Sequence, residues 1–179
     1  MRHRPHTGAL CLLLLALLGD GAQAADGGSP SEAAFSIGLP DRPWRLYVEL
    51  PGFDMGPVQN LKGGARAFGT AQAAGLSISL TLATSPGDPS ARSCRDHDWA
   101  GRQKAQPGHE DAQLSAQGDR ARVEFMVPVS GGEAVQEKHV LLYLQRDGVC
   151  AVAHLSKLHY QSSDADALER VLASVRLGS

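Results

Sequence analysis

The chain has few of the residues on which calcium-binding and nucleic-acid-binding proteins rely. Aromatic residues make up 5% of its 179 residues, and Asn60 is the only asparagine. A single asparagine removes the usual Asp/Asn pattern of a calcium-binding loop. The 17 lysines and arginines are outnumbered by 19 aspartates and glutamates, and no stretch of sequence gathers basic residues. Nucleic acid and anionic membrane surfaces are therefore poor candidate partners.

Short catalytic motifs are also missing. The sequence has no G-x-S-x-G nucleophile elbow and no S-x-x-K motif. Gly63-Gly64 and Gly131-Gly132 are isolated pairs without the rest of a phosphate-binding pattern. Asp96 and Asp98 are two positions apart on an expected helix, so their side chains face different directions. We therefore name no catalytic residue and favour a protein that is not an enzyme.

The five histidines that follow residue 24 do not show metal-ligand spacing. Zinc or copper needs three or four converging ligands, usually with one close pair. Cys94 and His97 are three positions apart and could face the same way on a helix, but no second close pair supports them. His154 and His159 are an odd number of residues apart on an extended segment, which places them on opposite faces. We expect solvated or packed histidines, with no metal site and no cofactor.

The first 24 residues have the pattern of a secretory signal peptide. Arg2 and Arg4 supply positive charge, Ala9 to Leu18 form a short apolar run, and Ala22-Gln23-Ala24 is an A-x-A cleavage site. The apolar run is too short to span a bilayer comfortably; an uncleaved N-terminal anchor is the alternative. Cleavage after Ala24 leaves residues 25–179.

The rest of the chain is expected to hold one domain. Residues 25–34 begin with a stretch rich in glycine, serine and proline and are expected to be a disordered lead-in. Residues 35–179 are long enough to bury a core without a metal or a second copy. No second apolar run approaches the length of a transmembrane helix. We therefore expect a periplasmic or secreted protein.

Two cysteines, Cys94 and Cys150, remain after the expected cleavage. In an oxidising compartment an isolated pair is more often a disulfide than a catalytic thiol. We therefore predict a disulfide between them. Two separately buried thiols and a reactive nucleophile are the alternatives.

The strongest structural signal is a β-hairpin over Glu137 to Lys157. Two apolar runs flank Asp147-Gly148, a pair typical of a two-residue hairpin turn. This turn fixes the register, so one face of the hairpin is wholly apolar and the other is mixed. The apolar face pairs Leu144 with Ala151, Leu142 with Ala153 and Val140 with Leu155; the mixed face pairs Tyr143 with Val152, Leu141 with His154 and Gln145 with Cys150. Because the alanines leave space, we expect a helix to cover the apolar face.

Two helices are expected. Leu168, Val171, Leu172 and Val175 form an apolar stripe on a helix over Asp164 to Ser174, with Ser163 as its N-cap. This is the helix expected over Ala151 and Ala153. A shorter helix over residues 94–105, capped by Ser93, has a poorer apolar stripe.

Alternating apolar residues predict strands elsewhere, at Phe35 to Leu39, Trp44 to Leu50, Arg66 to Ala73, Leu76 to Ala83, Ala112 to Gln117 and Arg120 to Val129. Phe53 to Gly64 lacks a period and is expected to be loop. Antiparallel strands with segregated helices indicate an α+β fold. We expect a sheet of about six to seven strands, with the C-terminal helix on one face and the short helix elsewhere, similar to an α/β/α sandwich.

The order of elements over 35–177, the long hairpin 137–157 and the ending ALERVLASVRL (Ala167 to Leu177) resemble the PsbP-like superfamily. This superfamily groups photosystem II extrinsic proteins, DcrB-type bacterial envelope proteins and a Ran-binding nuclear transport factor. The resemblance implies an antiparallel sheet with helices on both sides and mostly binding or accessory roles. No short motif defines the superfamily, so no functional residue is carried over. A Cys94–Cys150 link is not a feature of the superfamily as a whole.

The function favoured by the sequence is an exported, non-catalytic binding or accessory protein of the cell envelope with a protein partner. Trp99, flanked by Arg95 and Arg102, is the candidate exposed contact; the alternative is that Trp99 anchors its helix to the sheet. Two other classes stay open. One is a small metal- or thiol-dependent enzyme around Cys94 and His97, and the other is an immunity or inhibitor-type protein.

Overall fold

The computed structural model describes residues 34–85, 90–106, 109, 111–129 and 135–179. The expected signal peptide and the lead-in up to residue 33 lie outside the described residues, and Ala34 already begins a strand. The strands are β1 (Ala34–Gly38), β2 (Arg45–Glu49), β3 (Asp54–Met55), β4 (Gln59–Leu61), β5 (Gly64–Ala71), β6 (Leu76–Thr84), β7 (Gln113–Gln117), β8 (Arg120–Val129), β9 (Val135–Arg146), β10 (Val149–Lys157) and β11 (Arg176–Gly178). The α-helices are α1 (Ala91–Ala105) and α2 (Ala165–Ser174), and short 3₁₀ turns cover Gln72–Ala74 and Ser162–Asp164.

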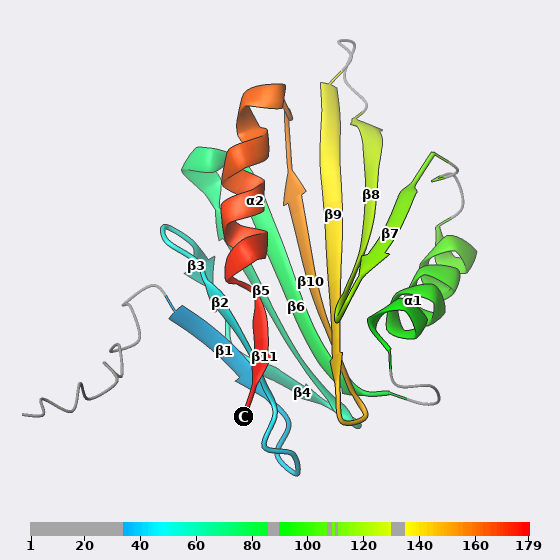
Figure 1. Cartoon of the computed structure of the whole chain (residues 1–179). Coiled ribbons are helices and arrows are strands. Elements are labelled where there is room, and N and C mark those ends of the chain that lie inside the picture. Colours follow the sequence, from blue (N-terminus) through cyan, green and yellow to red (C-terminus); the bar gives the residue numbers. More distant parts are fainter. Residues whose placement is uncertain (1–33, 86–89, 107–108, 110, 130–134) are drawn as a thin grey trace, which may run out of the picture.

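Most of the strands form one large antiparallel sheet (Figure 1). Its order is β3-β5-β6-β10-β9-β8-β7, and β4 also pairs with β5, which makes eight strands. A second, three-stranded sheet has the order β1-β2-β11. The expected α+β fold, with an antiparallel sheet and a C-terminal helix, is therefore confirmed.

The central hairpin has the predicted register. Asp147 and Gly148 both have positive φ, at 45° and 74°, which is the backbone that a two-residue hairpin turn requires. Leu144 pairs with Ala151, and Leu142 pairs with Ala153. Strand β10 also pairs with β6 on its other side, so the hairpin lies in the middle of the sheet.

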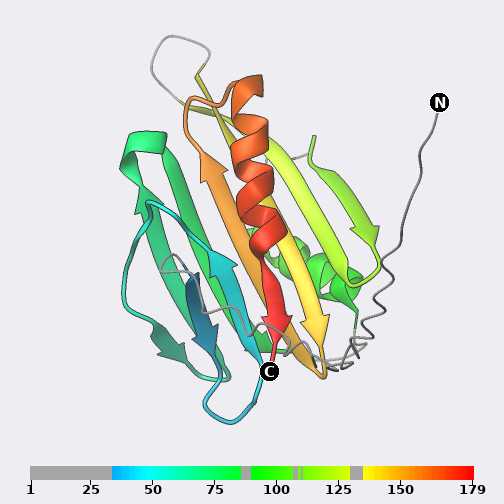
Figure 2. The same ribbon diagram turned by 60° about the vertical axis from the view of Figure 1, so that its left-hand side comes forward.

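One face of the large sheet is covered by α2 and by the three-stranded sheet. Figure 2 shows α2 lying along β9 and β10 with β1 and β2 beside it. The main core lies between these layers and is made of apolar side chains: Ile37, Leu46, Val48, Ala67, Ile78, Leu80, Leu82, Val140, Leu142, Leu144, Ala151, Ala153, Leu155, Leu168, Val171, Leu172 and Val175. The predicted packing of the C-terminal helix on the alanine face is therefore confirmed.

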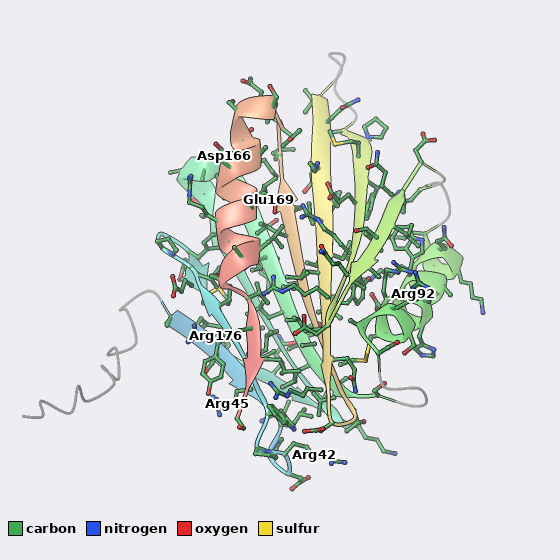
Figure 3. All side chains as sticks on the ribbon, viewed as in Figure 1. Arg42, Arg45, Arg92, Asp166, Glu169 and Arg176 are labelled. Atoms are coloured by element: carbon green, nitrogen blue, oxygen red, sulfur yellow. A yellow bond between two sulfur atoms is a disulfide. The ribbon has the colours of Figure 1, made fainter. Side chains whose placement is uncertain are left out.

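Helix α2 begins differently from the prediction. A 3₁₀ turn over Ser162–Asp164 precedes it, so Ser163 lies inside that turn and is not the cap. Asp164 is the N-cap residue of α2, and its carboxylate accepts a hydrogen bond of 2.9 Å from the backbone N–H of Gln161. Asp166 and Glu169 lie on the exposed side of the helix (Figure 3).

The opposite face of the sheet carries α1 and a second, smaller core. This core contains Ala91, Cys94 and Trp99 of α1 together with sheet residues Ala121, Val123, Leu141, Tyr143 and Val152. In Figure 2 α1 lies behind the sheet and α2 in front of it. The two helices therefore cover the two faces of one sheet, as the resemblance to the PsbP-like superfamily implied.

The segment expected to be loop between Phe53 and Gly64 contains two short strands. Gln59 of β4 pairs with Arg66, and Asp54 of β3 pairs with Thr70. Both strands add to the edge of β5, and they are too short to show an alternating pattern in sequence. The loop expectation is therefore wrong for residues 54–55 and 59–61, and also for Gly64, which begins β5.

Candidate functional site

Helix α1 is fixed to the sheet at its N-terminal half. Its N-cap is Ser90, whose hydroxyl accepts a hydrogen bond of 3.1 Å from the N–H of Ser93, while the Ser93 hydroxyl accepts one of 3.3 Å from Ser90. This reciprocal capping starts the helix three residues earlier than predicted, and Ser93 is not the N-cap. Cys94 lies in the first turn of the helix and forms a disulfide with Cys150 of β10, with the two Cα atoms 6.0 Å apart.

Trp99 and Arg95 are buried between α1 and the sheet. Trp99 is 5% exposed, and its ring lies 5.3 Å from that of Phe125. Arg95 is 6% exposed and donates to the backbone carbonyl of Ser115 at 2.7 Å and to the carboxylate of Asp96. Trp99 is therefore an anchor of the helix, as the alternative interpretation held, and it is not an exposed contact. Only Arg102 of the three predicted contact residues is partly exposed, and its binding role stays a prediction.

A polar cluster lies next to Trp99, where α1 meets the central strand β9. Asp98 Oδ2 accepts two hydrogen bonds, one of 2.7 Å from the hydroxyl of Tyr143 and one of 2.6 Å from Nε of Arg102. Tyr143 is fully buried. Burial and then the negative charge of Asp98 raise the pKa of the Tyr143 hydroxyl far above its usual value. Tyr143 is therefore a permanent hydrogen-bond donor at neutral pH.

Two histidines extend this cluster along the sheet. Nδ1 of His139 on β9 lies 3.0 Å from Nε2 of His154 on β10, so one ring donates to the other. The His139 ring also stacks on Phe125 at 4.8 Å between centroids. Burial lowers the pKa of both histidines, to about 4 for His154. Both rings are therefore neutral at pH 7.

The expectation of solvated or packed histidines did not include this pairing. His154 pairs with Leu141 in the hairpin register, and His139 is two residues from Leu141 on the same face. Such diagonal neighbours on adjacent strands are within reach of long or aromatic side chains. The predicted register therefore already contained the signal. Histidine spacing within a single strand does not contain this signal, because the two residues belong to different strands.

The residues of the alternative thiol or metal enzyme do not form a reactive site. The sulfur of Cys94 is bonded to Cys150, so Cys94 is not a free thiol, and His97 is exposed on the outer side of α1. Within the described ranges, no group of three or more histidine, cysteine, aspartate or glutamate side chains is arranged to hold a metal ion. The structure does not bring Cys94, His97 and Asp98 together as a site.

Beyond α1, the same face of the sheet becomes open toward β5. Arg66 of β5 pairs with Thr81, which pairs with Val152 of the α1 core, so the three side chains share this face. Arg66 and Phe68 are exposed. A hollow of about 260 Å³ is lined by Gln59, Arg66, Ala67, Phe68 and Ser79, just below the usual size of a small-molecule pocket.

Comparisons with known proteins identify the fold. By sequence, no protein-family model and no curated protein matches the chain. The solution structure of the cyanobacterial PsbP protein (CyanoP) of Synechocystis is similar, with a TM-score of 0.51 at 12% identity over 88% of this chain and 100% of CyanoP. A crystal structure of a protein from Bacteroides thetaiotaomicron matches with a TM-score of 0.45 at 9% identity over 75% of this chain and 45% of that protein.

The chain is therefore an α+β protein with a PsbP-like fold, as the order of its elements predicted. At 12% identity, the likeness to CyanoP concerns the fold alone. Among the described helices, none is long and apolar enough to cross a membrane.

Proposed function

We propose that the protein is exported and acts in the periplasm or as a secreted protein, as a non-catalytic binding or accessory protein with a protein partner. Residues 1–24 are then a signal peptide, and residues 35–179 are one α+β domain behind a short lead-in. The observation that carries this proposal is the Cys94–Cys150 disulfide. Structural disulfides persist in oxidising compartments and are rare in the cytosol, so the bond supports the interpretation of the N-terminus as an export signal.

The polar cluster supports a non-catalytic role, because its groups bind one another. Asp98 accepts from Tyr143 and Arg102, and His139 and His154 form their own pair. General acid–base catalysis is most efficient when the side chain has a pKa near the working pH. Burial instead moves the pKa of His154 to about 4 and raises that of Tyr143. The binding and accessory roles common in the PsbP-like superfamily agree with this proposal.

Export is tested by producing the full chain in a Gram-negative bacterium and measuring the intact mass of the protein released from the periplasm. We expect a chain that begins at Ala25 and is two hydrogens lighter than its reduced form. Ala24→Leu is the matched control, because a large residue at the cleavage position should leave the signal uncleaved. A full-length, reduced chain in the cytosol would contradict the proposal.

The partner is tested by photo-crosslinking in the native cell. A crosslinking residue replaces Phe68, which is 56% exposed on β5, or Leu114, which is 45% exposed on β7 near the other end of the sheet. We expect one stoichiometric protein captured from one position and not from the other, identified by mass spectrometry. Capture of a secreted toxin would favour the inhibitor alternative. If neither position gives a crosslinked partner and the protein remains a monomer, the accessory role would be contradicted.

A further inference from the structure

Helix α1 is attached unequally along its length. Its N-terminal half is held by the covalent Cys94–Cys150 bond and by the Arg95 hydrogen bond to Ser115. Its C-terminal half is held by the Asp98–Tyr143 hydrogen bond and by the contact of Trp99 with Phe125. Among these attachments, those of the C-terminal half are all noncovalent, whereas the N-terminal half also has a covalent bond.

The His139–His154 pair lies under this second half. The His139 ring stacks on Phe125 with an angle of 9° between the planes, and Phe125 contacts Trp99 of α1. The ring of His109, which follows the helix, also contacts the ring of Phe125, with 4.4 Å between the two centroids. A column of rings therefore connects the histidine pair to the C-terminal half of α1 and to the residue that follows it.

The hydrogen bond between the two imidazoles depends on their protonation. When both rings are neutral, one N–H donates to the lone pair of the other nitrogen. A first added proton is shared between the rings. A second proton places N–H against N–H, so the bond is lost and two positive charges face each other.

Charged groups from each neighbouring element act on the pair. Arg102 of α1 opposes a charge on His154, and Asp98 of α1 favours it. Glu137 of β9 lies 3.6 Å from Nε2 of His139 and favours a charge there, while His109 opposes it. The side chains that face the pair from β8 and β6 are Phe125 and Ser79, which do not titrate near neutral pH.

We propose that the His139–His154 pair is an acid-sensitive latch for α1. At neutral pH the pair holds the ring column and the C-terminal half of the helix on the sheet. Protonation of both rings breaks their hydrogen bond and repels Arg102, so this half of the helix leaves the sheet. The disulfide keeps the N-terminal half in place, which makes the opening local and reversible.

The direction of the pKa changes agrees with this latch. Burial lowers the pKa of both histidines below their usual 6.5 in the closed form. A base with a lowered pKa stabilises the closed form fully above pH 6.5, and this contribution decreases as the pH falls toward the closed-form pKa. The open form therefore binds more protons and gains population in acid, by about tenfold to 100-fold per pH unit for one or two protons taken up.

The test is hydrogen exchange of the oxidised protein, residues 25–179, between pH 7 and pH 4. The rates are expressed as protection factors, which correct for the intrinsic pH dependence of amide exchange. We expect the protection of residues 98–105 to stay constant down to about pH 6.5 and then to fall by about tenfold or more per pH unit until the pH approaches the closed-form pKa. The amides of β6, β10 and α2 should keep their protection over the same range. Protection of 98–105 that is constant down to pH 4, or that is lost together with all other elements, would overturn the latch.

Two matched variants separate the latch from general acid sensitivity. His154→Gln cannot take up a proton and still offers an N–H to His139, so the acid-induced loss of protection should become at least tenfold smaller. His97→Gln removes an exposed histidine from α1 itself and should behave like the natural sequence. An unchanged acid response in His154→Gln would overturn the proposal. If that variant does not fold, the exchange pattern of the natural sequence decides alone.

Discussion

The hydroxyl of Tyr143 donates a hydrogen bond of 2.7 Å to Asp98 Oδ2 and thereby joins the buried centre of β9 to the middle of α1. Tyr143→Phe removes the donor without changing the shape of the ring. We expect the free energy of unfolding to fall by about 1 kcal/mol, because Asp98 keeps Arg102 and some access to water. Urea denaturation measures this change. Tyr47→Phe, on half-buried β2, is the control and should have a smaller effect.

The alanine face of the hairpin leaves no room for a larger side chain. Ala153 is fully buried in the core that contains Leu168 and Leu172 of α2. Ala153→Leu should overpack this contact and lower the free energy of unfolding by about 1–3 kcal/mol. Ala173→Leu adds the same atoms on the exposed side of α2 and should change stability little. A denaturation midpoint that Ala153→Leu leaves unchanged would disprove the tight packing.

The disulfide closes a long loop, because its two cysteines, Cys94 and Cys150, are separated by 56 positions in the sequence. Loop-closure entropy predicts that Cys94→Ala/Cys150→Ala lowers the free energy of unfolding by about 2–4 kcal/mol. Reductant should destabilise the natural sequence to a similar level and leave the double variant unchanged. Equal unfolding midpoints with and without reductant would show that the bond does not support the fold.

Gly101 weakens the C-terminal half of α1 without a packing reason. A Cβ atom built at this position meets no atom within 4 Å. Gly101→Ala should therefore stabilise the protein by about 0.5–1 kcal/mol through the higher helix propensity of alanine. The neighbouring exposed Ala100 is the reverse control, since Ala100→Gly should lower stability by a similar amount. A loss of stability in Gly101→Ala would show that the helix needs this glycine.

An ion pair across α2 and β8 gives a second, weaker dependence on pH. Both carboxylate oxygens of Glu169 accept hydrogen bonds from Arg122, and these bonds lower the pKa of Glu169 below its usual 4.5. Its contribution to stability is therefore present above pH 4.5 and is lost as the pH falls through its pKa in the folded protein. Glu169→Gln should cost less than about 1 kcal/mol at pH 7, because the carboxylate is largely exposed. Added salt should reduce the difference between the two proteins, as measured by denaturation.

Local patterns predicted the centre of the fold well. The Asp147-Gly148 turn fixed the register of β9 and β10, and the apolar stripe of α2 identified the helix that covers Ala151 and Ala153. In both cases, residues close in sequence contain the whole signal. The face of the hairpin and its covering helix could therefore be predicted together.

The pairing of strands far apart in sequence, and the burial of side chains on α1, could not be predicted from local patterns. Strand β11 pairs with β2, so Leu177 lies beside Leu46, and nothing local in either strand indicates the other. The charged neighbours Arg95 and Arg102 indicated an exposed Trp99, but Arg95 is itself buried beside it. The His139–His154 contact, in contrast, follows from the predicted register of β9 and β10, in which the two residues are diagonal neighbours.

The free edge of β7 also has a consequence for the behaviour of many molecules together. Strand β7 is at one end of the large sheet, and all five of its residues are exposed. Such an edge is a template to which a strand of another molecule can add, and this is how sheets grow into aggregates. Ser115 pairs with Arg122, two residues from the Gln117–Arg120 pair that closes the hairpin, so its carbonyl faces β8 and the outward backbone groups of β7 belong to Leu114 and Ala116. We therefore expect concentrated protein to add strands at this edge, and a proline at Leu114 or Ala116 to reduce that addition.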